Sequence, residues 1–254
     1  MKKMLLLLPA LILASCLGRA CAAGLGVEAK LWRPDLDSKV RSSEDDIDGT
    51  DLSLEGDINI DSEDDVPWVK LWLGKGHRLT FTYMKFEFSG EDNPELNFNF
   101  GGERFRTSVE AKAKLESTVY RIAWEADWWH SRNFRLGTIF GTEIFDTEFS
   151  VENDAVGKEK VDVSVPVPIL GLQGEVGLPF GFGVYGEVAG LYIGYGKFEG
   201  GFIEWELGVK YSFGKQKNFS LIAGYRALDV TLEEDDDRAN LELGGFAFGV
   251  GLKF

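Results

Sequence analysis

The feature that most constrains this sequence is an alternation of apolar and polar residues that recurs along most of the chain. From Ile203 to Phe213, every odd position carries a large apolar side chain, and every even position is charged, small or hydroxyl-bearing. Large apolar residues also occupy alternate positions from Phe246 to Phe254. Side chains on a β-strand point alternately to opposite faces, so the pattern predicts strands with one continuous apolar face. We therefore expect an all-β structure.

The first 23 residues differ from the rest of the chain and are typical of a secretory signal peptide. Two lysines follow Met1, an apolar run extends from Leu5 to Leu13, and small residues come next. The run is too short to cross a bilayer as a stable helix. We expect cleavage after residues 1–23, which leaves one domain at 24–254. An alternative is lipidation at Cys16, because residues 13–16 resemble the lipobox of bacterial lipoproteins.

Alternating strands suit either a soluble sandwich with an apolar interior or a barrel whose apolar face meets lipid. The secretory signal favours the barrel, and so does a set of aromatic residues at one end of the predicted strands, which would form a girdle at a membrane interface. These aromatic residues are Trp128, Trp129, Phe134, Phe180, Phe182, Phe213, Phe219 and Phe254.

The predicted connections are unequal, which also favours a membrane barrel. The short ones are 74–76, 130–133, 179–181 and 214–218. The mostly longer and acidic ones are about 34–65, 89–106, 151–164, 196–201 and 232–239. They separate ten predicted strands, at about 24–33, 66–74, 77–88, 114–128, 133–150, 165–178, 182–195, 202–213, 218–231 and 240–254.

The expected fold is thus a transmembrane, antiparallel, up-and-down β-barrel of about ten strands. Eight or twelve strands are alternatives, because residues 109–116 alternate with a parity that shifts before Tyr120. That segment could extend a strand above the membrane or form an extra hairpin.

The chain resembles the Gram-negative outer-membrane β-barrel proteins. The residues that carry the resemblance are those of the final strand, which ends in an aromatic residue: Phe246, Phe248, Val250, Leu252 and Phe254. The resemblance implies that the barrel-assembly machinery reads this terminus, that the protein lies in the outer membrane, and that lipids and lipopolysaccharide surround it. It implies little about activity, since the superfamily includes proteins of very different function.

The polar face of the predicted strands would line the barrel lumen with a network of charged residues. Its members are Arg121, Glu125, Asp127, Arg135, Glu143, Glu175, Glu187, Glu204, Glu206, Lys210 and Arg226. Unpaired buried ions cost several kcal/mol, so we expect these charges to neutralise one another. The network would either fill and stiffen the barrel, in a protein of structural or surface-interaction role, or line a narrow cation-preferring channel for small solutes.

An outer-membrane enzyme acting on lipid or a surface polymer is a third hypothesis. The omptin proteases, outer-membrane phospholipases and lipid A deacylases use a histidine near the outer half of the barrel. Only His77 and His130 are present, both in predicted periplasmic turns. We therefore expect no catalytic residues of that kind.

The segment between Arg33 and Val66 is strongly acidic. Within it, Glu44, Asp46, Asp48 and Glu55 fall on the spacing of a helix-loop-helix calcium site. No flanking helices are predicted, so a solvated acidic collar is the alternative. Such a collar could also bind Ca²⁺ or Mg²⁺ as bridges to lipopolysaccharide phosphates. A net charge of −15 argues against nucleic acid as a partner.

Overall fold

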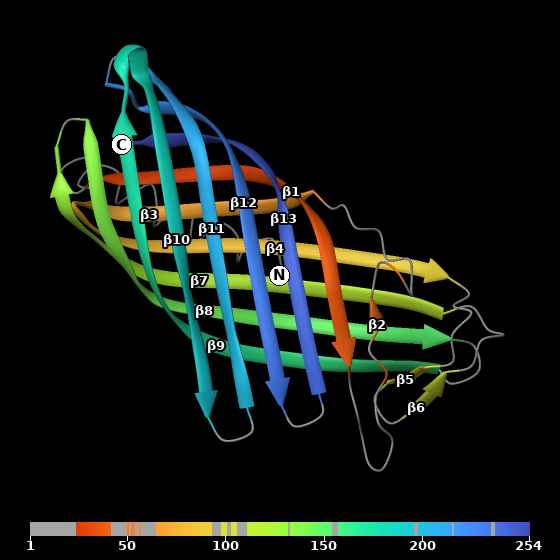
Figure 1. Ribbon diagram of the computed structural model, residues 1–254. Helices are drawn as coiled ribbons and strands as arrows, with labels where there is room; N and C mark the ends of the chain where they lie inside the picture. The colour runs from red at the N-terminus through yellow and green to blue at the C-terminus, as the bar shows by residue number, and fades with distance from the viewer. Residues whose placement is uncertain are drawn as a thin grey trace, which may run out of the picture.

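The computed structural model describes residues 24–41, 50, 52–53, 56, 65–92, 98–100, 103–105, 111–131, 133–153, 157–195, 198–214, 216–234 and 237–254. Ten long strands form a barrel (Figure 1). They are β1 (Leu25–Arg41), β3 (Val66–Lys75), β4 (His77–Asp92), β7 (Ala111–His130), β8 (Phe134–Asn153), β9 (Gly157–Gly177), β10 (Phe182–Tyr195), β11 (Phe198–Phe213), β12 (Phe219–Glu234) and β13 (Asp237–Lys253).

Each barrel strand is antiparallel to the barrel strand that precedes it in the chain, and β13 pairs with β1 to close the barrel. The closing register runs from Gly26 opposite Lys253 to Arg41 opposite Arg238. Short strands β2 (Leu52–Ser53), β5 (Phe98–Phe100) and β6 (Glu103–Phe105) lie outside this ring of pairings. The predicted all-β, antiparallel, up-and-down barrel is confirmed with ten strands, and eight and twelve are excluded.

One end of the barrel, here called the turn end, holds the short connections, including the 3-10 turn η1 (Pro179–Gly181). All eight predicted girdle residues lie at this end with exposed side chains. Their rings contact one another, for example Trp129 with Phe134 and Phe213 with Phe219, at centroid distances of 5.8 and 5.7 Å. The opposite end is called the loop end.

From the girdle toward the middle of the barrel, the outward-facing side chains are apolar. Phe140, Leu207 and Phe248 are 62%, 58% and 61% exposed. Continuous exposure of large apolar side chains around a barrel is the signature of a surface that faces lipid. Within the described ranges, no helix has the length and apolarity needed to span a bilayer.

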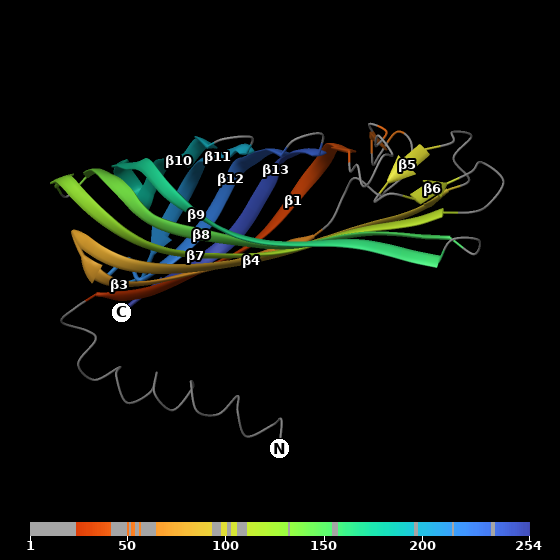
Figure 2. The ribbon, with the colours of Figure 1, turned by 90° about the horizontal axis from the view of Figure 1, so that it is seen from below.

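Toward the loop end the barrel separates into two sheets, as Figures 1 and 2 show: β4 with β7–β9, and β10–β13 with β1. Side-chain polarity reverses there. Phe86 and Phe88 on β4 point inward and are 1% exposed, whereas Lys85 and Glu87, which alternate with them, point outward. We call this region the loop-end half, and the part with an apolar exterior the turn-end half.

The predicted long connections prove too long. Strand β1 continues to Arg41 where a loop was expected from residue 34, and β9 begins at Gly157 where its start was expected at 165. The connections predicted at 151–164 and 232–239 are mostly strand. The reason is that these strand ends lie beyond the apolar belt. Their outward positions carry charges because they face water, and a charge-rich segment resembles a loop in sequence.

The parity shift before Tyr120 has the same origin. Strand β7 runs unbroken through this region, and its only register shift lies at Asp127/Trp129. Ala113 and Leu115 share the inner face with Arg121 and Glu125. The inner face thus changes from apolar to charged along one regular strand, while the backbone keeps its period. From Ala111 onward, the part of the segment that the structure describes extends strand β7 and forms no hairpin of its own.

Candidate functional site

Regular strand register places oppositely charged side chains beside each other on the inner face of the turn-end half. Arg121 on β7 lies opposite Glu143 on β8, and Arg226 on β12 lies opposite Glu206 on β11. Directly opposed residues on one face of an antiparallel pair have adjacent side chains. Local pairing along the sheet therefore begins the network, and contacts across the barrel complete it.

The first cluster is centred on two arginines at mid-depth. Arg121 donates from Nη1 to Glu187 Oε1 at 2.9 Å and from Nη2 to Glu143 Oε2 at 3.0 Å, and it also contacts Glu204. Arg226 donates from Nη1 to Glu206 Oε2 at 3.3 Å and from Nη2 to Glu204. Glu204 thus bridges arginines from opposite walls of the barrel.

The second cluster lies closer to the turn end around Glu125. Lys70 Nζ is 2.6 Å from Glu125 Oε1, and Arg78 donates to the other carboxylate oxygen. Gln173 Nε2 also donates to Glu125 Oε2, at 3.1 Å. Lys70 is 3.4 Å from Glu187 Oε2, which links this cluster to Arg121. Because Glu125 is 1% exposed, its charge is compensated by these neighbours and not by bulk water.

The third cluster joins the strands on either side of the β13–β1 closure. Lys30 Nζ donates to Glu206 Oε1, and the Tyr185 hydroxyl donates to the same oxygen, both at 2.5 Å. Tyr185 reaches this position because residue 208 is glycine, where a Cβ would lie 2.7 Å from the tyrosine hydroxyl oxygen. Lys210 Nζ lies 3.1 Å from Glu28.

Two tryptophans on the inner face contribute aromatic contacts to the network. Lys30 Nζ lies 4.1 Å from the Trp68 ring centroid, and the Arg226 guanidinium lies 5.5 and 5.7 Å from Trp32 and Trp68. Such contacts favour a cation more strongly when it is desolvated. The tryptophans and Tyr185 were missed by sequence reasoning. Their positions in the sequence could have revealed them, because each lies two residues from an inward-facing charged residue and therefore shares its strand face.

All eleven residues predicted for the lumen network face the barrel interior. Three of them, Asp127, Arg135 and Glu175, lie toward the turn end. Arg135 is 3.6 Å and Lys210 3.7 Å from Glu175, and Asp127 is 4.0 Å from Arg78. With the further inward charges, the described residues of the turn-end half place eight cations and eight anions in the interior: Lys30, Lys70, Arg78, Arg121, Arg135, Lys210, Arg226 and Lys253, with Glu28, Glu125, Asp127, Glu143, Glu175, Glu187, Glu204 and Glu206.

The space left among these charges is small, and apolar side chains fill the interior beyond them. The polar cavity at the turn end has a volume of about 50 Å³, which is room for one or two water molecules. Toward the loop end, Trp32, Met84 and Phe88 are almost fully buried in one apolar cluster. Phe145 and Phe202 meet there edge to face, with centroids 5.1 Å apart. Among the described residues, charged side chains therefore occupy the lumen at the first level, and apolar side chains pack across it at the second.

The two histidines lie at the turn end, at the termini of β4 and β7. The His77 ring stacks on Trp124 at 5.5 Å, and His130 Nδ1 is 3.2 Å from Asp127 Oδ2. Both lie at the end that holds the short connections, as predicted, and the periplasmic location of this end stays a prediction.

The residues of the predicted assembly signal lie on β13 and at its end. Phe246, Phe248 and Val250 point outward and are exposed, Leu252 is half-buried, and Phe254 is exposed. The backbone N–H of Phe254 donates to the Leu25 carbonyl at 2.8 Å, which ties the terminus to β1. Recognition of this strand by assembly machinery stays a prediction.

The predicted calcium ligands Glu44, Asp46, Asp48 and Glu55 lie outside the described residues. Within the described ranges, no group of three or more His, Cys, Asp or Glu side chains could hold a metal ion.

No protein-family model matches this chain, and no curated protein matches it. Solved structures with a similar fold include the outer membrane protease OmpT from Escherichia coli, at 12% identity and TM-score 0.43, covering 91% of this chain and 96% of that one. Another is Neisserial surface protein A, at 14% identity and TM-score 0.33, with coverages of 91% and 97%.

A third is the transport unit of the autotransporter AIDA-I from Escherichia coli, at 9% identity and TM-score 0.42, with coverages of 91% and 88%. At these identities and TM-scores the comparisons carry no argument by themselves. The closed antiparallel barrel and its apolar outer belt are themselves the evidence: this chain has the fold of a Gram-negative outer-membrane β-barrel protein.

Proposed function

We propose that the protein is an integral outer-membrane barrel with a filled, non-conducting lumen and a structural or surface-interaction role. The observation that carries this proposal is the interior itself. Paired charges occupy the turn-end half, and an apolar cluster occupies the loop-end half. Ions cross a membrane protein only along a hydrated path, and a cavity of about 50 Å³ provides no such path.

Location in the outer membrane is supported by the exterior of the barrel. The apolar belt requires a hydrocarbon environment, and in the turn-end half each described barrel strand pairs with both of its neighbours, which satisfies the backbone groups of the belt. Extraction of cell membranes with alkaline carbonate tests insertion directly. We expect the protein to stay in the pellet and to dissolve in detergent, and release by carbonate alone would contradict insertion.

Surface interaction is assigned to the loop end because its outer face is charged. Lys114 Nζ is 2.8 Å from Glu87 and 3.0 Å from Glu116, and Lys160 Nζ is 3.1 Å from Glu148. These outward charges would lie at the level of lipopolysaccharide head groups, where divalent cations could bridge carboxylates to phosphates.

Single-channel recording in planar bilayers tests the filled lumen. We expect no conductance steps from the folded protein, because ion pairs and apolar side chains obstruct the pathway. Stable steps would overturn the proposal and support the narrow cation-preferring channel. A porin of known conductance, inserted in the same membranes, is the control for reconstitution.

The proposal includes no catalytic role. In the described part of the chain, the side chains of both histidines are engaged with Trp124 or Asp127 at the turn end, and neither projects into the lumen as a base beside a nucleophile. Incubation of the purified protein with labelled lipopolysaccharide, phospholipid and peptides tests this directly. Turnover of any of the three would contradict the assignment.

A further inference from the structure

The barrel wall has a seam between β9 and β10. These strands pair from Gly177 opposite Gly183 to Leu170 opposite Gly190, where their pairing ends. Both strands continue: β9 stays paired with β8 as far as Gly157 opposite Asn153, and β10 stays paired with β11 as far as Tyr195 opposite Phe198. The two described strands therefore part within the wall of the barrel, at the border of the apolar belt.

Two prolines on β9 make the seam a property of the sequence. Pro166 and Pro168 lie just beyond the last β9–β10 pair, and their ladder with β8 is uninterrupted. Residues two apart on a strand direct their backbone groups to the same side of the strand. Because the ladder with β8 is uninterrupted, Val167 directs its backbone groups toward β8, and the nitrogens of Pro166 and Pro168 are on the other side. That side faces β10. Since proline has no backbone N–H, two hydrogen bonds that would pair β9 with β10 cannot form.

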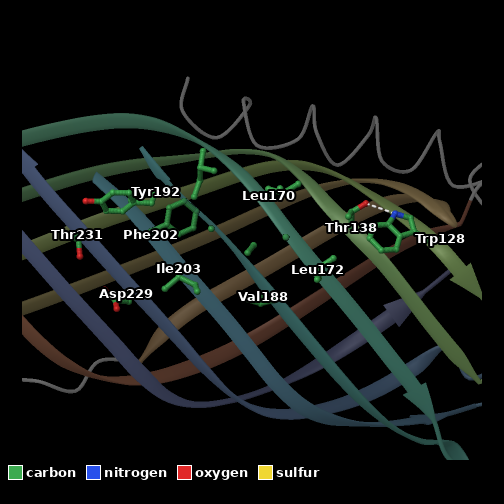
Figure 3. A pocket seen from close by; sticks show the side chains of 15 residues that line it. Trp128, Thr138, Leu170, Leu172, Val188, Tyr192, Phe202, Ile203, Asp229 and Thr231 are labelled. Carbon is green, nitrogen blue, oxygen red and sulfur yellow. Dashed lines mark hydrogen bonds between the residues drawn. The ribbon is translucent and has the colours of Figure 1, made fainter. Parts of the chain in front are cut away.

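An apolar groove of about 750 Å³ lies on the outer surface over this seam. Figure 3 shows it running from Trp128 and Thr138 at one end, past Leu172, to Asp229 and Thr231 at the other. Trp128 Nε1 donates to Thr138 Oγ1 at 3.2 Å, which satisfies the indole within the apolar surface. The volume is within the range of about 300–1,000 Å³ that is typical of small-molecule sites.

The groove reaches side chains that belong to the interior. Phe202 lines it and is also part of the buried apolar cluster, where its ring packs against Phe145. Ala189, which is 2% exposed, lines it as well. The floor of the groove is therefore formed by side chains that also belong to the barrel interior.

The position of the groove determines the chemistry of its occupant. Leu170, Leu172, Val188 and Ile203 belong to the lipid-facing belt, so the medium that contacts them is hydrocarbon. At the loop end of the groove, Asp229 lies opposite Glu242 on the next strand, and both residues are exposed on the outer face. Two neighbouring carboxylates would repel an anionic head group.

We propose that this seam groove binds one hydrocarbon chain of a membrane amphiphile with an uncharged, hydroxyl-bearing head. The chain lies along Leu172, Val188 and Ile203, and the head lies beside Asp229 and Thr231, whose oxygens accept hydrogen bonds from hydroxyl groups. This inference rests on the membrane insertion proposed above.

Native mass spectrometry of the full-length protein, purified in detergent and mixed with monopalmitoylglycerol, tests the site. We expect one retained adduct per chain. In Val188→Trp an indole fills the groove, and we expect at least about ten-fold weaker retention, since even a few lost methylene contacts have that effect. Val209→Trp is the matched control, because Val209 faces lipid on β11 outside the groove, and it should bind like the wild type.

Equal retention by wild type and Val188→Trp, or an unselective series of adducts, would overturn the proposal. Folding of each variant is judged by heat-modifiable gel migration. If Val188→Trp does not fold, Ile203→Trp takes its place, because Ile203 also lines the groove. Palmitate is the second probe: we expect weaker retention than for the glyceride and recovery in Asp229→Asn. Equal binding of the two probes to the wild type would refute the assigned head group. Carbonate extraction reports insertion separately, so failure of this site and failure of the proposed function are distinguishable.

Discussion

In the turn-end half of the barrel, Leu207 and Phe248 point outward and Arg226 points inward, whereas in the loop-end half Lys85 points outward and Phe86 points inward. The strands are continuous between the halves, and their side chains keep a period of two. What differs is the surrounding medium, which is hydrocarbon around one half and water around the other. The comparison shows that one regular strand can satisfy two opposite solvation requirements by exchanging the residue types on its faces.

The largest expected loss of stability concerns the charged interior of the turn-end half. Arg226→Ala leaves Glu204 and Glu206 buried without one of their partners. Breaking a buried ion pair from one side costs about 3–5 kcal/mol. The free energy of unfolding, from urea titration in lipid vesicles, should fall by that amount. Arg226→Met with Glu204→Leu removes both charges and should recover most of the loss. No recovery would show that packing, and not charge, explains the effect.

The loop-end interior should respond to lost volume. Phe86→Ala removes a ring that is 1% exposed and packs at 5.8 Å from Phe88, and we expect a loss of about 3 kcal/mol. The same urea titration measures it. Phe248→Ala is the control, since acyl chains can occupy the vacated space on the outer surface, and its loss should be clearly smaller. Equal losses would contradict the contrast between a packed interior and a lipid-facing exterior.

The two exteriors should differ in their tolerance of a charge. Leu207→Arg introduces a cation into the apolar belt and should destabilise the barrel by about 2–3 kcal/mol. Ser164→Arg introduces the same side chain on the outer face of β9 in the loop-end half, where the effect should stay within about 0.5 kcal/mol. Similar penalties at both positions would place Ser164 in lipid and move the border of the belt.

The smallest effect concerns the outward charges of the loop-end half. Hydrogen bonds from Lys85 and Lys114 hold the pKa of Glu116 below its ordinary value. Because its pKa is lower in the folded state, Glu116 adds stability that is present above the unfolded-state pKa and is lost as the pH falls through the folded-state pKa. The pairs are largely exposed, so the contribution is under about 1 kcal/mol.

Urea titrations of wild type and Glu116→Gln from pH 7 to pH 3 measure this difference. We expect a small, constant gap that closes below about pH 4. A gap that widens on acidification would show that Glu116 is not stabilised as a carboxylate.

The inner face of the turn-end half could be predicted from alternation alone, whereas the choice of a barrel over a sandwich also needed the secretory signal, the aromatic girdle and the unequal connections. Arg121 and Glu143, for example, were assigned to the lumen because a strand has only two faces. The limits of the strands could not be predicted, because Lys158 and Lys160 on β9 resemble loop residues when only sequence is considered. Trp32, Trp68 and Tyr185 escaped for a related reason: an aromatic residue on a barrel strand suits either face.

The sequence by itself determined the period of the strands and the signs of the charges on each face, since these follow from side-chain types at fixed spacing. It left the number of strands at eight, ten or twelve, and the structure decided for ten. Only the tertiary structure decided which charges meet. Arg226 lies on β12 and Glu204 on β11, yet Glu204 also contacts Arg121 on β7 across the barrel. Likewise, the seam depends on where β9 and β10 diverge. Contacts across the lumen depend on how the sheet closes and bends, and no local pattern encodes that geometry.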